Sequence, residues 1–144
     1  MMKTANDKTD ARTTDLCLRA FVHLQVASPA QAEVLARRAV RIQEHNPQPH
    51  ALLALALRGL GRLSEAEKHA RQALELAPGQ PDYLFTLGLC LWSAGDPGEA
   101  QGLFEKALGK APERSDMLMD FSGFLIHQQQ FEDALNRARK AREL

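Results

Sequence analysis

Aromatic residues are scarce in this sequence, which also has few cysteines, no excess of either charge and no long hydrophobic run. Only 6% of the 144 residues are aromatic, with a single Trp and a single Tyr, so the core must be built mainly from Ala and Leu. The two cysteines, Cys17 and Cys90, lie far apart in the chain and form no Cys-x-x-Cys motif. This spacing argues against a disulfide framework and against a zinc knuckle.

The charge balance and the hydrophobic pattern exclude several classes of partner. Eighteen Lys and Arg balance eighteen Asp and Glu, which argues against a protein held to nucleic acid or to an anionic membrane mainly by bulk charge. The longest apolar run, Ala51–Leu57, is too short to cross a bilayer, and the polar first fifteen residues lack the apolar core of a secretory signal. We therefore expect a cytoplasmic protein without nucleic-acid binding or membrane insertion. Residues 1–12 are expected to be disordered because they have almost nothing to bury.

An internal repeat of 34 residues organises the rest of the chain. A weaker first copy at 13–46 is followed by two complete copies, the second at 47–80 and the third at 81–114, and by a fourth at 115–144. Small residues recur in the second half of each copy, where they let neighbouring helices approach closely. The residue pairs that define the period between the two complete copies are Pro47 and Pro81, Leu53 and Leu87, Gly61 and Gly95, Ala66 and Ala100, Ala73 and Ala107, and Pro78 and Pro112.

Each copy is predicted to form two helices joined by a tight turn. In residues 47–80, an apolar segment runs from His50 to Leu60, and Gly61 supplies a residue that ends a helix at low steric cost. A second helix follows and is stopped by Pro78. In the next copy, Asp96 and Pro97 have the character of a helix N-cap and first helical residue. The sequence therefore predicts an all-α fold.

These features together resemble the tetratricopeptide repeat (TPR) family. The segments ALLALALRGLGRLSEAEKHARQALELAP and YLFTLGLCLWSAGDPGEAQGLFEKALGKAP carry its pattern of Leu, small residue, inter-helix Gly, paired Ala and closing Pro. The resemblance implies a right-handed superhelical solenoid of antiparallel helix pairs, with a single TPR domain over residues 13–144. Copy 13–46 is degenerate, since Arg19 and His23 stand where the family has apolar or aromatic residues, and is either a true repeat or a helical cap. The polar last helix is expected to close the array, so that the chain is a complete protein.

Catalytic and metal-binding motifs are missing from the sequence. It has no Gly-rich phosphate loop, no His-Glu-x-x-His and no Gly-x-Ser-x-Gly. The five histidines share no ligand spacing, and His45 and His50 are interpreted as ordinary residues flanking a turn. Asp116 and Asp120, one helical turn apart, are interpreted as solvated or partner-contacting carboxylates, and Cys90 as a buried structural thiol. We expect no enzyme activity, no cofactor and no metal.

The first helix of each copy carries the functional hypothesis. It is apolar around most of its circumference, whereas a helix buried on one side is usually amphipathic. We place Leu53, Leu57, Leu87 and Leu91 inside the copies and expect the remaining apolar positions to line a concave groove. The groove residues predicted in this way, with three polar neighbours, are Leu18, Phe21, Ala51, Leu52, Leu55, Arg58, Phe85, Thr86, Leu89, Trp92, Met119, Asp120 and Ile126.

An apolar groove predicts a protein–protein interaction module, an adaptor or scaffold that binds an apolar peptide or helix of a partner. Two alternatives stay open: a homodimer formed through the groove, and a chaperone similar to the small TPR chaperones of bacterial type III secretion. The cationic clamp by which some TPR proteins hold chaperone C-termini is absent. Its matching positions here are Ala51, Leu55, Thr86, Asp116 and Asp120, none of which is a cation.

Overall fold

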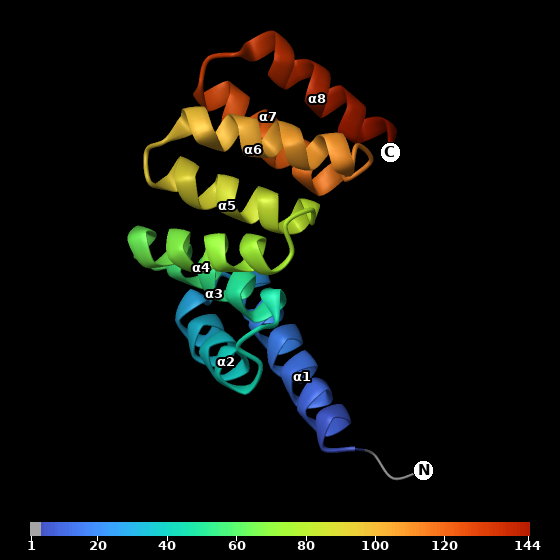
Figure 1. Ribbon diagram of the computed structural model, residues 1–144. Helices are drawn as coiled ribbons and strands as arrows, with labels where there is room; N and C mark the ends of the chain where they lie inside the picture. Colours follow the sequence, from blue (N-terminus) through green and yellow to red (C-terminus); the bar gives the residue numbers. More distant parts are fainter. Residues whose placement is uncertain (1–3) are drawn as a thin grey trace. The chain divides into compact units, whose positions relative to one another are not determined.

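The computed structural model describes residues 4–144, apart from the side chain of Phe131, and its described secondary structure is entirely helical. The eight described helices are α1 (Ala5–Gln25), α2 (Pro29–Ile42), α3 (Pro47–Gly59), α4 (Leu63–Leu76), α5 (Pro81–Ser93), α6 (Pro97–Lys110), α7 (Ser115–His127) and α8 (Phe131–Glu143) (Figure 1). Helices α3, α5 and α7 begin at the first residue of their copies. The predicted all-α class is therefore confirmed.

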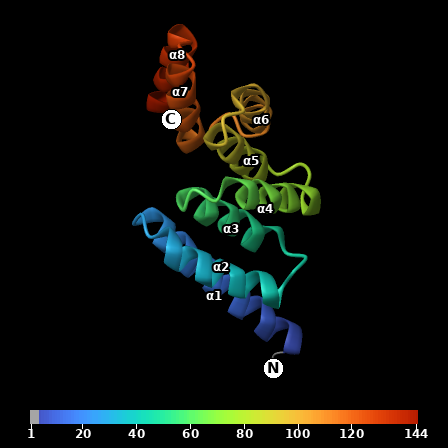
Figure 2. The ribbon, with the colours of Figure 1, turned by 90° about the vertical axis from the view of Figure 1, so that its left-hand side faces the viewer.

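The helices form two compact units, Met1–Gly79 and Gln80–Leu144, called here the N-terminal and C-terminal units. In the N-terminal unit α1 packs on α2, α3 packs on α4, and α3 also contacts α1 and α2. In the C-terminal unit α5 packs on α6, α7 packs on α8, and α6 contacts α7. The partners of each pair run antiparallel (Figure 2). Each unit thus consists of two helix pairs.

One turn geometry joins the two helices of all four pairs. Gly61 and Gly95 have φ values of 77° and 88°, and Ala27 and Gln129, at the same position of the 34-residue period, have φ values of 53° and 63°. The next residue donates a backbone hydrogen bond to a carbonyl five residues earlier, as in Ser28 N–H to His23 O at 2.8 Å and Arg62 N–H to Leu57 O at 2.9 Å. The first pair therefore has the turn of a repeat although Ala replaces Gly.

The core of each unit consists of small and apolar side chains from both helices of a pair. Leu53 and Leu57 are 1% and 0% exposed, and Leu87 and Leu91 are 1% and 3% exposed. The prediction that these four leucines pack inside their copies is confirmed. The recurrent alanines of the second helices are fully buried as well: Ala32, Ala39, Ala66, Ala73, Ala100 and Ala107.

Helix α1 begins further towards the N-terminus than the sequence predicted. We expected residues 1–12 to be disordered; residues 1–3 lie outside the described residues, but α1 already begins at Ala5. A capping box holds this end, because the Asp7 N–H donates to Thr4 Oγ1 at 3.1 Å and the Thr4 N–H donates to Asp7 Oδ2 at 3.0 Å. Local hydrogen bonds thus form a helix where side-chain burial could not.

Candidate functional site

The structure leaves part of the predicted groove accessible. Leu18 and Phe21 on α1 are 62% and 49% exposed, and Met119 and Ile126 on α7 are 53% and 54% exposed. These values are high for large apolar side chains. Asp120 is also exposed, and four further predicted groove residues are partly exposed: Leu55, Arg58, Leu89 and Trp92.

Four predicted groove residues are buried instead: Ala51, Leu52, Phe85 and Thr86. Phe85 turns towards the second helix of its own pair, where its ring lies 4.6 Å from the ring of Phe104 between centroids. Thr86 bonds within α5, because its Oγ1 donates to the Asp82 carbonyl at 2.8 Å. The expectation that these residues are accessible on a groove is therefore wrong.

Trp92 is a packing residue of the C-terminal unit. Its ring lies 5.2 Å from Phe124 and 5.9 Å from His127 between centroids, and edge-to-face contacts of this kind stabilise aromatic clusters. Its partly exposed position leaves one side near the surface. Fluorescence from Trp92 will therefore report mainly on the packing of α5 against α7.

An apolar pocket lies in the N-terminal unit where α1 ends, α2 begins and α3 ends. Its volume is about 400 Å³, which is within the size range of small-molecule and side-chain binding sites. Three predicted groove residues, Phe21, Leu55 and Arg58, line it. The complete lining is Phe21, Leu24, Gln25, Ala27, Pro29, Leu55, Arg58 and Gly59.

The turn conformation of the first helix pair shapes this pocket. Ala27 has a left-handed backbone, which directs the chain from α1 into α2 and places Pro29 beside α3. The close approach requires Gly59, since a Cβ at that position would lie 2.9 Å from Pro29 Cβ. Arg58 is the one charged residue among those lining the pocket, and no carboxylate lines it. The pocket can therefore bind apolar groups.

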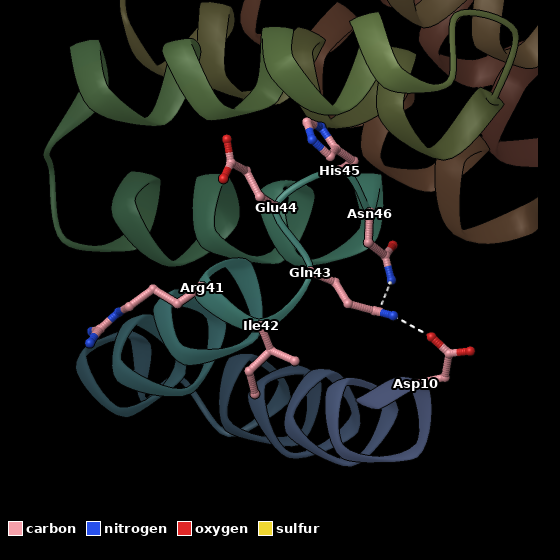
Figure 3. A pocket seen from close by; sticks show the side chains of 7 residues that line it. All are labelled: Asp10, Arg41, Ile42, Gln43, Glu44, His45 and Asn46. Carbon is pink, nitrogen blue, oxygen red and sulfur yellow. Dashed lines mark hydrogen bonds between the residues drawn. The ribbon is translucent and has the colours of Figure 1, made fainter. Parts of the chain in front are cut away.

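A second, polar pocket of about 560 Å³ lies on another part of the same unit (Figure 3). It is formed by the turn between α2 and α3 together with Asp10 of α1. The Asn46 side-chain amide donates to Gln43 Oε1 at 3.0 Å, and the Gln43 amide donates to Asp10 Oδ1. These bonds attach the first half of α1 to the turn. A polar lining of this kind does not suit an apolar ligand.

Two histidines that the sequence analysis did not pair meet between α3 and α4. His50 Nδ1 lies 3.2 Å from His69 Nδ1, and His50 Nε2 lies 2.8 Å from the Glu44 carbonyl oxygen. A carbonyl can only accept, so His50 carries its proton on Nε2 and accepts a hydrogen bond from His69 Nδ1–H. Burial lowers the pKa of His69, and the electrostatic effects of His50, Arg37 and Lys68 lower it further, against an opposing effect of Glu65.

The spacing of the histidines along the chain does not reveal this pair, because residues 50 and 69 belong to different helices. Comparison along the 34-residue period shows that Leu84 and Leu103 occupy the same two positions in the next copy. Two polar residues at paired apolar positions would have marked the site.

Charged side chains elsewhere form local ion pairs. Arg62 contacts Glu33 at 2.6 Å and Glu65 at 2.7 Å, and Arg37 contacts both carboxylates as well. In the C-terminal unit Arg114 lies 3.0 Å from Asp82 and 2.9 Å from Asp116. The hydrogen bond from Arg114 holds the pKa of Asp116 below its usual value. Asp116, interpreted from the sequence as solvated or bound by a partner, is therefore paired within the chain.

Cys17, which precedes the exposed Leu18, is buried with 2% of its surface exposed. Burial raises the pKa of its thiol to about 11 from a reference of 9.0, and since the thiolate is the reactive form, alkylation is slowed. We predict that iodoacetamide at pH 8 modifies Cys17 of the folded protein at least about 100-fold more slowly than that of the urea-unfolded protein. Peptide mass spectrometry over time measures both rates, and equal rates would contradict the buried position.

Residues 4–144 include no helix that is long and apolar enough to cross a membrane. In the same residues, no three His, Cys, Asp or Glu side chains gather into a metal-binding group.

Comparison with known families and structures gives a consistent match to one repeat type. A family model described as tetratricopeptide repeat matches residues 19–81 and 51–115, and a second model with the same description matches residues 91–143. The matches together extend over most of the chain and include most of the weak first copy. No curated protein matches the sequence significantly.

Solved structures share the fold at low sequence identity. The crystal structure of MamA matches with a TM-score of 0.69 and 15% identity, covering 99% of this chain and 95% of that one. A thermophilic TPR protein of Thermus thermophilus matches with a TM-score of 0.80 and 18% identity, covering 89% of this chain and 71% of that one. A mutant O-GlcNAc transferase of Thermobaculum terrenum matches with a TM-score of 0.75 and 22% identity, covering 86% of this chain but 23% of that one.

Proposed function

Since the chain belongs to the tetratricopeptide repeat family, whose repeats form protein–protein interaction modules, we propose that it is a non-catalytic adaptor that binds an apolar segment of a partner protein. We place the binding site at the apolar pocket between α1, α2 and α3. The observation that carries the proposal is this pocket of about 400 Å³ with a half-exposed Phe21 at its wall. We also propose that the four copies, residues 13–144, form a single TPR domain.

The chemistry of the pocket defines the expected partner. Phe21, Leu24 and Leu55 offer apolar surface that gains free energy when water is displaced. Arg58 lines the pocket beside these apolar side chains. Leu18 extends the apolar surface along α1. A peptide or helix can bind here by inserting one or two large side chains.

Substitution of Phe21 tests the site. We predict that Phe21→Ala weakens partner binding at least about tenfold, because a large side chain at the centre of an interface contributes disproportionately to affinity. The protein is purified with an affinity tag, co-purifying proteins are identified, and the affinity of each for the wild type and for the variant is measured by calorimetry. Val34→Ala is the matched control, since Val34 is 59% exposed on α2 and does not line the pocket.

The outcome also separates the proposal from its alternatives. Equal affinity of the wild type and Phe21→Ala, with Val34→Ala also unchanged, would place the partner elsewhere. A dimer in sedimentation equilibrium that Phe21→Ala dissociates would identify the occupant as a second copy of this chain. A type III secretion-type chaperone is a narrower form of the same function, for which the co-purified protein would be an export substrate with an apolar segment.

A further inference from the structure

The histidine pair between α3 and α4 occupies positions that are both apolar in the first and third copies, whereas the fourth copy has Leu118 and Arg137 there. Residues 50 and 69 are both His, whereas the same positions hold Leu16 and Leu35 in the first copy and Leu84 and Leu103 in the third. Leu16, Leu35 and Leu84 are buried with 3%, 6% and 1% exposure, and His50 is equally buried with 4%. A pair of leucines at these two positions is therefore compatible with the packing of the two helices. The imidazole pair calls for an explanation beyond helix packing.

The distance between the two imidazoles suits a shared metal ion. Two nitrogen ligands at about 2.0–2.1 Å from one tetrahedral ion lie about 3.3 Å apart, and His50 Nδ1 and His69 Nδ1 lie 3.2 Å apart. The bond from His50 Nε2–H to the Glu44 carbonyl fixes the tautomer that leaves the Nδ1 lone pair free for a ligand bond. Metal-ligating histidines are usually oriented by such a second bond to a carbonyl or carboxylate.

A third donor lies on the same face of α4. Gln72 follows His69 by three residues, so the two side chains lie on one side of the helix. Gln72 Oε1 is buried and has no hydrogen-bond partner among the described residues, and a buried carbonyl without a partner is costly. His50 and Gln72 both line a cavity of about 220 Å³. The cavity provides space for water ligands beside His50 and Gln72.

The charges around this cavity are mixed. Glu44 and Glu75 line it together with His45 and Leu76, and these two carboxylates favour a cation. The positive charges of Arg37 and Lys68 near His69 disfavour a cation, and the negative charge of Glu65 partly offsets them. Imidazole nitrogen with an amide oxygen selects borderline divalent ions of the Zn²⁺, Ni²⁺ and Cu²⁺ class over Mg²⁺ or Ca²⁺.

We propose that His50 Nδ1, His69 Nδ1 and Gln72 Oε1 bind one divalent transition-metal ion, with water in the remaining coordination positions. On binding, the neutral His69 carries its proton on Nε2 instead of Nδ1, and the hydrogen bond between the two rings is replaced by two metal–nitrogen bonds. The ion joins α3 to α4 within the second copy and stabilises the N-terminal unit. The site is separate from the apolar pocket, so its failure and the failure of the proposed adaptor function are independent.

Metal titration of the chelator-stripped protein tests the proposal. We expect Zn²⁺ alone, at about 100 times its dissociation constant, to raise the Tm by about 5 °C or more, while Mg²⁺ has no effect. The paired variant His50→Leu with His69→Leu restores the side chains of the first and third copies, and it should fold by circular dichroism and lose the zinc-dependent rise. His127→Gln, an exposed histidine in the C-terminal unit, is the matched control and should keep it.

Two measurements complete the test. Calorimetry should give one zinc ion per chain, with at least about tenfold weaker binding in Gln72→Leu. Nitrogen-15 spectra of the histidine rings should show Nδ1 of both His50 and His69 shifting on zinc addition. Absence of a Tm rise with Zn²⁺, Ni²⁺ and Cu²⁺ in the wild type would overturn the site. Retention of the rise in the paired leucine variant would also overturn it, by placing the ion elsewhere.

Discussion

Replacing Phe104 by alanine is expected to lower the free energy of unfolding of the C-terminal unit by about 3–5 kcal/mol, because a large cavity is left in a close-packed core. Phe104 on α6 is fully buried and lies at the centre of an aromatic cluster. Its ring centroid is 4.6 Å from that of Phe85, 5.1 Å from Phe124 and 5.7 Å from Phe121. Urea unfolding followed by circular dichroism and by Trp92 fluorescence measures the loss.

The cluster depends on one glycine. A Cβ added at Gly88 would lie 2.5 Å from Phe104 Cε1, so Gly88→Ala should cost about 1–3 kcal/mol through overpacking. When Phe104 is also replaced by Ala, this clash disappears, and the double variant should lose less stability than the two single variants added together. Gly102→Ala is the control, because nothing lies within 4 Å of its added Cβ, and there alanine should stabilise the helix. Additive losses would contradict the predicted contact.

Repeat periodicity predicted the fold because it depends on features that recur at fixed spacing. Gly61 and Gly95 adopt the positive φ that the turn requires, and the paired alanines of the second helices are buried. The sequence leaves the first copy open as a repeat or a cap because Arg19 and His23 stand where the family has apolar or aromatic residues. Ala27, at the position of the turn glycine in the second and third copies, nevertheless adopts the same positive φ.

The candidate site was predictable only in part, because the first helices are apolar around their circumference. Periodicity alone could not decide which apolar side of α5 faces its own pair. The sequence pattern predicts that Phe85 lies on the groove. In the structure its ring packs against Phe104, which stands at the position of Ala70 in the second copy. In α1 and α3, Phe21, Leu55 and Arg58 line one apolar pocket, and their role in binding a partner stays a prediction.

Introducing a phenylalanine at position 70 of the second copy is the second substitution for which we expect a large loss of stability. Ala70 is fully buried on α4, and its counterpart in the third copy is Phe104. Ala54, also fully buried, stands where the third copy has Gly88. Ala70→Phe therefore adds a ring without the glycine that makes room for it, and we expect the N-terminal unit to lose about 3 kcal/mol or more. Urea unfolding followed by circular dichroism measures the loss.

A compensating variant distinguishes this mechanism from a general intolerance of α4 to aromatic residues. Ala54→Gly combined with Ala70→Phe reproduces the third-copy pair and should recover part of the lost stability, although Ala54→Gly alone costs about 1 kcal/mol in helix propensity. Lys68→Phe places the same ring at an exposed position of α4 and should change stability by less than about 0.5 kcal/mol. No recovery in the double variant would show that Gly88 does not act by making room. Recovery would show that one matched pair of residues determines the interior of each copy: Gly88 with Phe104 in the third copy, and Ala54 with Ala70 in the second. The turns and the 34-residue period are the same in both copies.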